Sequence, residues 1–384
     1  MRSGTILCVL VFVFVLGAGC GNGSSGGHAD METPPDMGRA ATDHPPLWRL
    51  THLNNGTAQT APEVWTVVWP GDEALGAQIA DFLDWMLQSD YWMTSMGEYG
   101  IGAGTSKGVI VMSTPAPALL GDAQMAGLAT MLVANGQITG NSNTQVAFFP
   151  PTTTKVTLEG SASCSAFLGY HSHATNTTNA VAYSITARCT GTPGTDLDGI
   201  TDTLSHETAE AATDAVPGNG IIDSSPAHQE VADLCEFGED LAIDVPADAM
   251  HPSARRYWVQ RLYSDMRAAQ GTVDPCLPLP TDRPYFNVAF DPEVFIGAPG
   301  SAATIDARLD VFAYGDVGPI QWIASSGGAD VEPFQGTAMA GDTIPIKVTP
   351  GGTLQNGQVI EIDILSESAK AGSQLWFGYI KAGQ

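Results

Sequence analysis

The chain has 384 residues, 43% of them hydrophobic and 15% charged, so it is long enough for two ordinary domains and too apolar to be disordered. Its 41 acidic residues against 15 lysines and arginines give a net charge of -26. Nucleic acids and anionic membrane surfaces would be repelled by this charge, so we predict no nucleic-acid partner.

The N-terminal residues have the features of an export signal. Residues 1–19 contain Arg2, a long apolar run and then small residues before Cys20, which is too short for a membrane-spanning helix. The segment resembles a bacterial lipoprotein signal, in which Cys20 is lipidated and becomes the mature N-terminus; ordinary cleavage beside an incidental cysteine is the alternative. We expect an exported protein, lipid-anchored at the bacterial cell surface or in the periplasm, with residues 20–45 as a flexible tether.

Alternating strand and helix patterns follow, and they predict an α+β or α/β domain over residues 46–278. Short β-branched or alternating runs predict strands at 62–69, 108–112, 144–149, 169–173 and 180–185. Apolar residues at helical spacing predict helices at 74–87 and 118–134.

Four further cysteines indicate two disulfides, because an even number in an exported chain is typical of an oxidising compartment. They are Cys164, Cys189, Cys235 and Cys276. Three pairings are open, and the nearest-neighbour pairing would close two separate loops. A four-cysteine metal site would require close C-x-x-C pairs, which the chain lacks.

The stretch 201–237 carries the candidate chemistry. Asp202 or Thr203 could cap a helix of about three turns, on which His206, Glu210 and Asp214 lie four residues apart along one face. Glu207 follows the histidine, as the general base does in H-E-x-x-H zinc peptidases, and Glu210 replaces the second histidine. A carboxylate can also ligate zinc, so the sequence predicts a metal held by His206 and Glu210 with Glu207 as the base.

A second short helix, predicted at 229–235, would bring Glu230 and Asp233 back toward the metal. Glu230 is our candidate for the third ligand, with Asp214 and Asp233 in supporting positions or as replacements. So many carboxylates would make zinc a weaker catalyst or favour Ca²⁺ or Mn²⁺. A Glu-rich helix can also be simply a solvated surface, and this alternative stays open.

Two other groups could belong to the site. His171 lies on a predicted strand and could act on the substrate side, for instance by stabilising an oxyanion, or be purely structural. Arg255, Arg256 and Arg261 could pair with Asp214 or Asp233, although ordinary surface pairs are commoner.

The run LSHETAEAATD followed by EVADLCE resembles the signature of the EXORDIUM-like, phosphate-induced family of secreted bacterial and plant cell-wall proteins. Further matches in order support the resemblance over about residues 46–278: SDYW with EYG, then Cys164 with GYHS, and YWVQ before Cys276. The resemblance implies a zincin-like domain and supports the site residues above. It implies no settled reaction, since the plant members are associated with cell-wall growth without one.

Residues 280–384 have a different sequence pattern from the rest of the chain. Short alternating β-branched runs are separated by Gly, Pro, Asp and Ser turns at regular spacing, which predicts an all-β, immunoglobulin-like sandwich. Trp322 and Trp376 could contact carbohydrate but are more typical of a core. We interpret this part as a binding or spacer module.

The sequence therefore predicts a membrane-anchored zinc peptidase-like hydrolase that acts on polypeptide or on a cell-envelope ligand. The alternative is a non-catalytic cell-surface binding protein with a structural metal or carboxylate cluster. Sugar hydrolysis by Glu207 and Glu230 ranks last, because no feature of the sequence selects a sugar.

Overall fold

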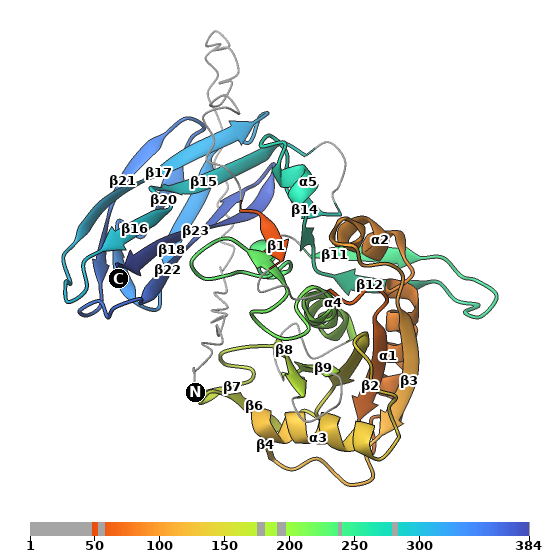
Figure 1. The fold of residues 1–384 in the computed structure, drawn as a ribbon. Helices are drawn as coiled ribbons and strands as arrows, with labels where there is room; N and C mark the ends of the chain where they lie inside the picture. The colour runs from red at the N-terminus through yellow and green to blue at the C-terminus, as the bar shows by residue number, and fades with distance from the viewer. Residues whose placement is uncertain are drawn as a thin grey trace, which may run out of the picture.

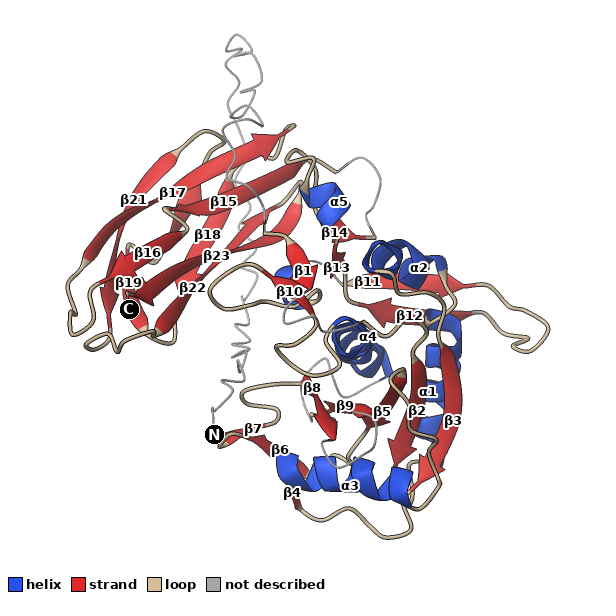
Figure 2. Cartoon of the chain, viewed as in Figure 1, coloured by secondary structure: helices blue, strands red, loops and turns tan. Residues whose placement is uncertain are grey.

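The computed structural model describes residues 48–52, 58–174, 181–189, 197–236, 240–278 and 283–383. The predicted signal, Cys20 and the tether lie outside the described residues. Helices occur only before residue 270, whereas the described residues after 283 form strands (Figures 1 and 2). No helix in these described ranges is long and apolar enough to span a membrane.

The first part is built on a five-stranded sheet of order β3-β2-β5-β9-β8. Four strands are parallel and the edge strand β8 runs antiparallel to β9. Their bounds are β2 Glu63–Val68, β3 Thr105–Val111, β5 Thr144–Phe148, β8 Gly169–Ala174 and β9 Val181–Thr186. All five lie within two or three residues of the strands predicted from the alternating runs.

Helices cover both faces of this sheet because successive side chains of each strand point to opposite sides. Val64 and Val68 of β2 share one core with α1 (Glu73–Met86) and α4 (Leu197–Thr213). Val67, between them in sequence, belongs to a second core with α3 (Asp122–Ala134). The site helix α4 therefore lies on the same face of the sheet as α1.

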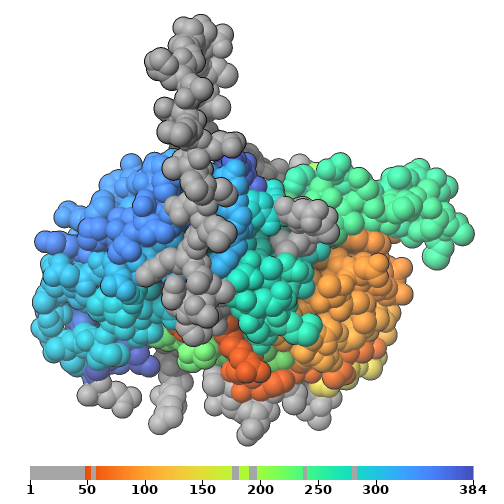
Figure 3. All heavy atoms as spheres, turned by 90° about the horizontal axis from the view of Figure 1, so that it is seen from above, coloured from red at the N-terminus to blue at the C-terminus, as the bar shows by residue number. Residues whose placement is uncertain are grey.

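Smaller elements close the ends of this part. Strand β1 (Leu50–His52) pairs with β10 (Ile221–Asp223), and β13 (Leu262–Tyr263) with β14 (Cys276–Leu277). The hairpin of β11 (Leu241–Val245) and β12 (Arg255–Val259) projects beyond the body (Figures 1 and 3). The remaining elements are α2 Asp90–Met96, η2 Gly97–Tyr99, β4 Leu119–Gly121, β6 Lys155–Leu158, β7 Ser161–Ala162, η4 Asp233–Cys235 and α5 Asp265–Ala268.

The two disulfides take the nearest-neighbour pairing. Cys164 bonds Cys189 across 25 residues, and Cys235 bonds Cys276 across 41 residues. The second disulfide ties the one-turn helix η4 to strand β14 and so fixes the chain directly after Asp233. The expectation of two disulfides is confirmed.

The C-terminal part is a two-sheet β-sandwich, as expected from its short alternating runs. One sheet has the order β15-β17-β21-β19 and the other the order β16-β23-β22-β18-β20. Trp322 and Trp376 are buried in the core between the sheets, so they offer no carbohydrate platform. The strand bounds are β15 Tyr285–Asp291, β16 Val294–Gly297, β17 Ile305–Tyr314, β18 Ile320–Ser325, β19 Ala329–Glu332, β20 Gln335–Ala338, β21 Thr343–Pro350, β22 Val359–Ser368 and β23 Gly372–Ala382.

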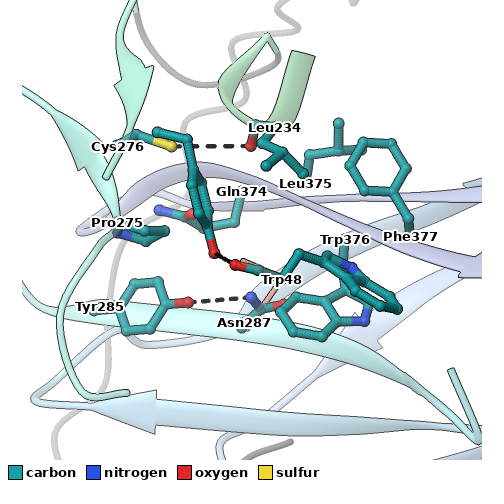
Figure 4. Close-up of a pocket in the computed structure, with 11 residues that line it drawn as sticks. Trp48, Leu234, Pro275, Cys276, Tyr285, Asn287, Gln374, Leu375, Trp376 and Phe377 are labelled. Atoms are coloured by element: carbon teal, nitrogen blue, oxygen red, sulfur yellow. Dashed lines mark hydrogen bonds between the residues drawn. The ribbon is translucent and has the colours of Figure 1, made fainter. Parts of the chain in front are cut away.

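The sandwich packs closely against the first part. Phe377 and Tyr379 of β23 belong to the same buried cluster as α1 and α4, and Tyr379 stacks edge-on against Trp48 at 5.8 Å between ring centroids. A cavity of about 20 Å³, with room for about one water molecule, remains at this junction (Figure 4). The sandwich, which we interpreted from its sequence as a binding or spacer module, thus also contributes to the core of the first part.

Among the described residues the three arginines pair with neither Asp214 nor Asp233, and each pairs with another carboxylate instead. Arg255 pairs with Asp81 and Asp248, Arg256 with Asp244, and Arg261 with Asp274. Arg255 and Arg256 lie on the projecting strand β12, which turns their side chains toward nearer carboxylates. Arg261 instead reaches the loop before Cys276.

Candidate metal centre

Helix α4 carries three of the predicted site residues and begins earlier than predicted. It starts at Leu197 and has 17 residues, so Asp202 and Thr203 lie in its interior and are not N-caps. The reason is that Ile200 and Leu204 are buried in the core and extend the apolar stripe toward the N-terminus. The extra turns lengthen the helix ahead of His206.

One group of possible ligands forms around His206. Its Nε2 atom lies 3.0 Å from Oε1 of Glu210, one turn further along α4, and 3.7 Å from Oδ1 of Asp233 on η4. The three atoms are within 4.8 Å of one another, close enough to hold one ion. The i, i+4 spacing seen in the sequence therefore does place His206 and Glu210 together.

Gln260 fixes the orientation of the His206 ring. Its Nε2 donates to the carbonyl of Ala232 at 2.7 Å, which leaves its Oε1 to accept from Nδ1 of His206, also at 2.7 Å. The backbone nitrogen of Gln260 in turn donates to Ser205 Oγ. With Nδ1 protonated in this way, Nε2 of His206 is the nitrogen available to a metal.

A second group forms around His171 on the edge strand β8. Its Nδ1 lies 3.4 Å from Glu210 Oε2 and 3.9 Å from Glu207 Oε2. Its Nε2 donates to the backbone carbonyl of Asp214 at 3.0 Å and lies 3.5 Å from Glu230 Oε1. His171, which we had left between an active-site and a structural role, is therefore in direct reach of the metal-motif helix.

The third residue of the first group is Asp233, whereas Glu230 was our candidate for the third ligand. Asp233 is near His206, whereas Glu230 faces the Nε2 side of His171. The helix predicted at 229–235 does not form. Its place is taken by the one-turn helix η4, and the residues just before it, Val231 and Ala232, are buried in the core. Glu230 therefore stands in the loop before the turn and points to the other histidine.

Asp214 closes the turn after α4. Its carboxylate accepts hydrogen bonds from the backbone nitrogens of Gly218 and Asn219, and its carbonyl accepts from His171. Gly220 allows this close return, because an added Cβ would lie 2.3 Å from the carbonyl oxygen of Thr213. Asp214 thus supports the site rather than facing His206.

The electrostatics of these residues favour a bound cation. Five carboxyl groups from α4, the following turn and the η4 segment surround two imidazoles, and both Glu207 and Glu210 are only 3% exposed. Burial raises the pKa of Glu207 to about 8, whereas the adjacent His206 overcomes the effect of burial and lowers the pKa of Glu210 to about 2. Burial would lower the pKa of His171, but Glu230 and Glu210 raise it to about 10.

Buried oxygens without hydrogen-bond partners point to the same conclusion. Glu207 Oε2 and Glu230 Oε1 make no hydrogen bond. Such groups are costly to bury unless something compensates them. The donor set of imidazole nitrogen and carboxylate oxygen suits a divalent ion such as zinc, so the residues present fit the predicted metal.

Further carboxyl groups surround the site and were not predicted from the sequence. Asp202, Glu236 and Asp240 lie near His206, and their pKa values are raised first of all by burial. The sandwich adds Glu361 and Asp363 of β22, and Gln229 Nε2 donates to Glu361 Oε2 at 2.6 Å. The alternation in β22 indicated that these two side chains share a face of the strand, but not what that face contacts.

Replacing Gln260 with leucine is expected to weaken zinc binding about 10- to 100-fold, because His206 loses the acceptor that holds its ring and tautomer. Chelator competition measures the affinity. Gln270→Leu, at an exposed position on the far side of α5, is the control and should bind zinc as wild type does. Equal affinity in Gln260→Leu would show that the ring needs no such support.

Replacing Gly169 with alanine is expected to destabilise the fold by about 1–3 kcal/mol. The new Cβ would lie 2.4 Å from Glu207 Oε1 and 3.0 Å from the carbonyl oxygen of Ile185, so Glu207 must move. Urea unfolding measures the change. Gly127→Ala in α3 meets no atom within 4 Å and should be neutral or stabilising; a similar response from both variants would contradict the packing argument.

No family model and no curated protein matches the chain. Among solved structures, a PapD-like domain of human CEP192 is similar at 13% identity and a TM-score of 0.20, covering 29% of this chain and 92% of that domain. The CsuC–CsuE chaperone–adhesin complex of Acinetobacter baumannii has 10% identity and a TM-score of 0.20 over 25% of this chain and 56% of that one. A conjugative transposon lipoprotein from Bacteroides eggerthii has 11% identity and a TM-score of 0.18 over 26% and 97%. Similarities this weak carry no conclusion about function.

Proposed function

We propose that the protein is a metal-dependent hydrolase, with zinc as its ion and polypeptide as its substrate class. The observation that carries the proposal is the group of His206, Glu210 and Asp233, with Glu210 buried and the other two partly so, whose ligand atoms lie within 4.8 Å of one another. One imidazole and two carboxylates form a set that zinc accepts. Glu207, next in sequence to the histidine, is available as the general base.

The surrounding fold supports a zincin-like assignment of the first part. The motif helix α4 packs on β8 and β9, and β8 is the antiparallel edge strand of the sheet that the described residues form. In zinc peptidases an edge strand beside the site binds the backbone of the substrate, and we propose this role for β8. The resemblance to the EXORDIUM-like family favours the same assignment, with an immunoglobulin-like sandwich following it.

The roles of the side chains follow from their positions. A bound zinc ion would act as a Lewis acid on the scissile carbonyl. Glu207 would accept a proton from the attacking water and pass it to the leaving amine. Its pKa of about 8 arises from burial, and a neighbouring dication would lower the pKa so that the carboxylate is ionised at neutral pH.

The same chain features favour a location outside the cytoplasm. Two disulfides are typical of proteins in oxidising compartments. A lipid on Cys20 would tether the folded body to the membrane through residues 20–45. The substrate would then be a polypeptide or another component of the cell envelope.

A non-catalytic binding protein with a structural metal is the second candidate, and the depth of the site favours it. Glu207 and Glu210 are nearly inaccessible, and the junction cavity is lined by none of the metal-centre residues. In this alternative the ion would hold α4, β8 and η4 together. Its loss would cost stability rather than turnover.

Zinc content and peptidase activity of the full chain test both candidates, with Glu207→Gln as the decisive variant. A hydrolase would hydrolyse a general peptide substrate pool in the wild type, and the variant would lose turnover at least 100-fold while keeping the fold. A binding protein would show zinc without turnover in either form. Absence of zinc from the wild type, even after zinc is offered, would overturn both candidates.

A further inference from the structure

We infer that Glu210 bridges two divalent cations, one held with His206 and Asp233 and a second held with His171 and Glu207. The inference rests on the proposed function for the first ion and adds a second ion to the same site. It makes the centre a two-metal site whose ligands come from α4, β8 and η4. No sequence motif for a single zinc site would suggest this arrangement.

The two oxygens of Glu210 face different histidines. Oε1 lies 3.0 Å from Nε2 of His206, and Oε2 lies 3.4 Å from Nδ1 of His171. The two groups of possible ligand atoms share only this residue. A carboxylate that presents one oxygen to each of two ligand sets has the geometry of a bridge between paired ions, which in two-metal hydrolases lie about 3.5–4 Å apart.

Both histidines are held in the same way. His206 donates from its outer nitrogen to Gln260 Oε1 and turns Nε2 inward, while His171 donates from Nε2 to the carbonyl of Asp214 and turns Nδ1 inward. Metal-binding histidines characteristically donate their other N–H to such an acceptor. The matching arrangement on a strand and on a helix is expected if each ring serves an ion.

An independent observation supports the second group. Glu207 is 3% exposed, and its Oε2, which faces His171 across 3.9 Å, has no hydrogen-bond partner. Its other oxygen lies against the Cα position of Gly169, where no side chain could fit. Glu207 is therefore held in place by packing, and its Oε2, which makes no hydrogen bond, faces His171 of the second group.

The second ion changes the part that Glu207 plays in the proposed reaction. With Oε2 bound to the second ion, Glu207 would be a metal ligand. It would then no longer be the free general base of the one-ion mechanism. Two dications would also balance the five carboxyl groups of the centre better than one does.

Metal counting on the full chain tests the inference. After saturation with zinc and dialysis, we expect two equivalents in the wild type, one in His171→Ala, one in His206→Ala and none held tightly in Glu210→Ala. His173→Ala, two residues along the same strand and in neither group, is the matched control and should keep two. Circular dichroism confirms that each variant is folded.

A cobalt titration of the wild type keeps the test independent of variants that fail to fold. Two successive phases in the visible spectrum, with a fall in the Co²⁺ paramagnetic resonance signal per ion during the second, would support a bridged pair. Saturation at one equivalent, with His171→Ala still binding one, would overturn the second site and leave the proposed function intact. No binding at all would overturn both.

Discussion

Raising the pH from about 5.5 to 8.5 is expected to lower the melting temperature of the metal-free protein by about 10 °C or more, and saturating zinc is expected to remove most of this loss. The cause is the set of buried groups that keep protons in the folded state after the unfolded chain has released them. The measurement is thermal unfolding at several pH values, with chelator or with zinc.

The direction follows from the sign of each pKa shift. Burial raises the pKa of Glu207 to about 8, of Glu236 to about 7 and of Glu361 to about 9, against 4.5 in the unfolded chain. Burial would lower the pKa of His171, but Glu230 and Glu210 raise it to about 10, against 6.5 in the unfolded chain. A group whose pKa is higher in the folded state than in the unfolded chain stabilises the fold fully at a pH below its unfolded pKa. This stabilisation is lost as the pH rises through its folded pKa.

Glu210 has the opposite sign but acts outside this range. Its pKa is lowered to about 2, chiefly by His206, so its stabilisation is complete above about pH 4.5 and is lost only in acid. Zinc restores stability at high pH because it replaces the missing protons with positive charge. A melting temperature that stays level or rises between pH 5.5 and 8.5 without metal would contradict this account.

Replacing Arg261 with methionine is expected to cost about 3–5 kcal/mol of unfolding free energy. Its guanidinium is 2% exposed, lies 2.6 Å from Asp274 Oδ2, and also donates to the carbonyl of Cys276. The variant leaves Asp274 buried, with the Cys276 amide and Gln374 as its remaining donors among the described residues. Urea unfolding measures the loss.

Arg256→Met is the control for this prediction. Arg256 and its partner Asp244 are 60% and 81% exposed, so their pair is worth about 0–1 kcal/mol. The double variant Arg261→Met with Asp274→Leu should recover part of the stability, because no charge is then left buried. Equal stability of Arg261→Met and Arg256→Met would refute the role of the buried pair.

The local part of the site could be predicted from the sequence, because short-range spacing determines it. His206, Glu207 and Glu210 share a helix, and the alternating strand placed His171 on one face of the sheet. The spacing could not show where α4 begins, since that depends on Ile200 and Leu204 finding a core that distant residues build. The choice between Glu230 and Asp233 depended likewise on how η4 is held by Cys276.

Contacts between distant segments were beyond the sequence patterns. Gln260 carries no charge and sits in an ordinary strand pattern, so only its position beside His206 reveals its role. Glu361 and Asp363 alternate like any exposed strand residues, and nothing local indicates that the face they share meets Gln229. For the same reason the sequence could not identify the partners of the three arginines.

The burial of Phe377 and Tyr379 in the core of the first part also bears on how such a protein can change over evolution. Sandwich modules are commonly exchanged between proteins as independent pieces, joined by a linker to whatever precedes them. Here an exchanged module would leave an apolar hollow beside α4 and η4 unless its own outer face offered matching aromatic side chains. A replacement of the sandwich would therefore require matching changes in the first part, so we expect the two parts to be exchanged together rather than singly.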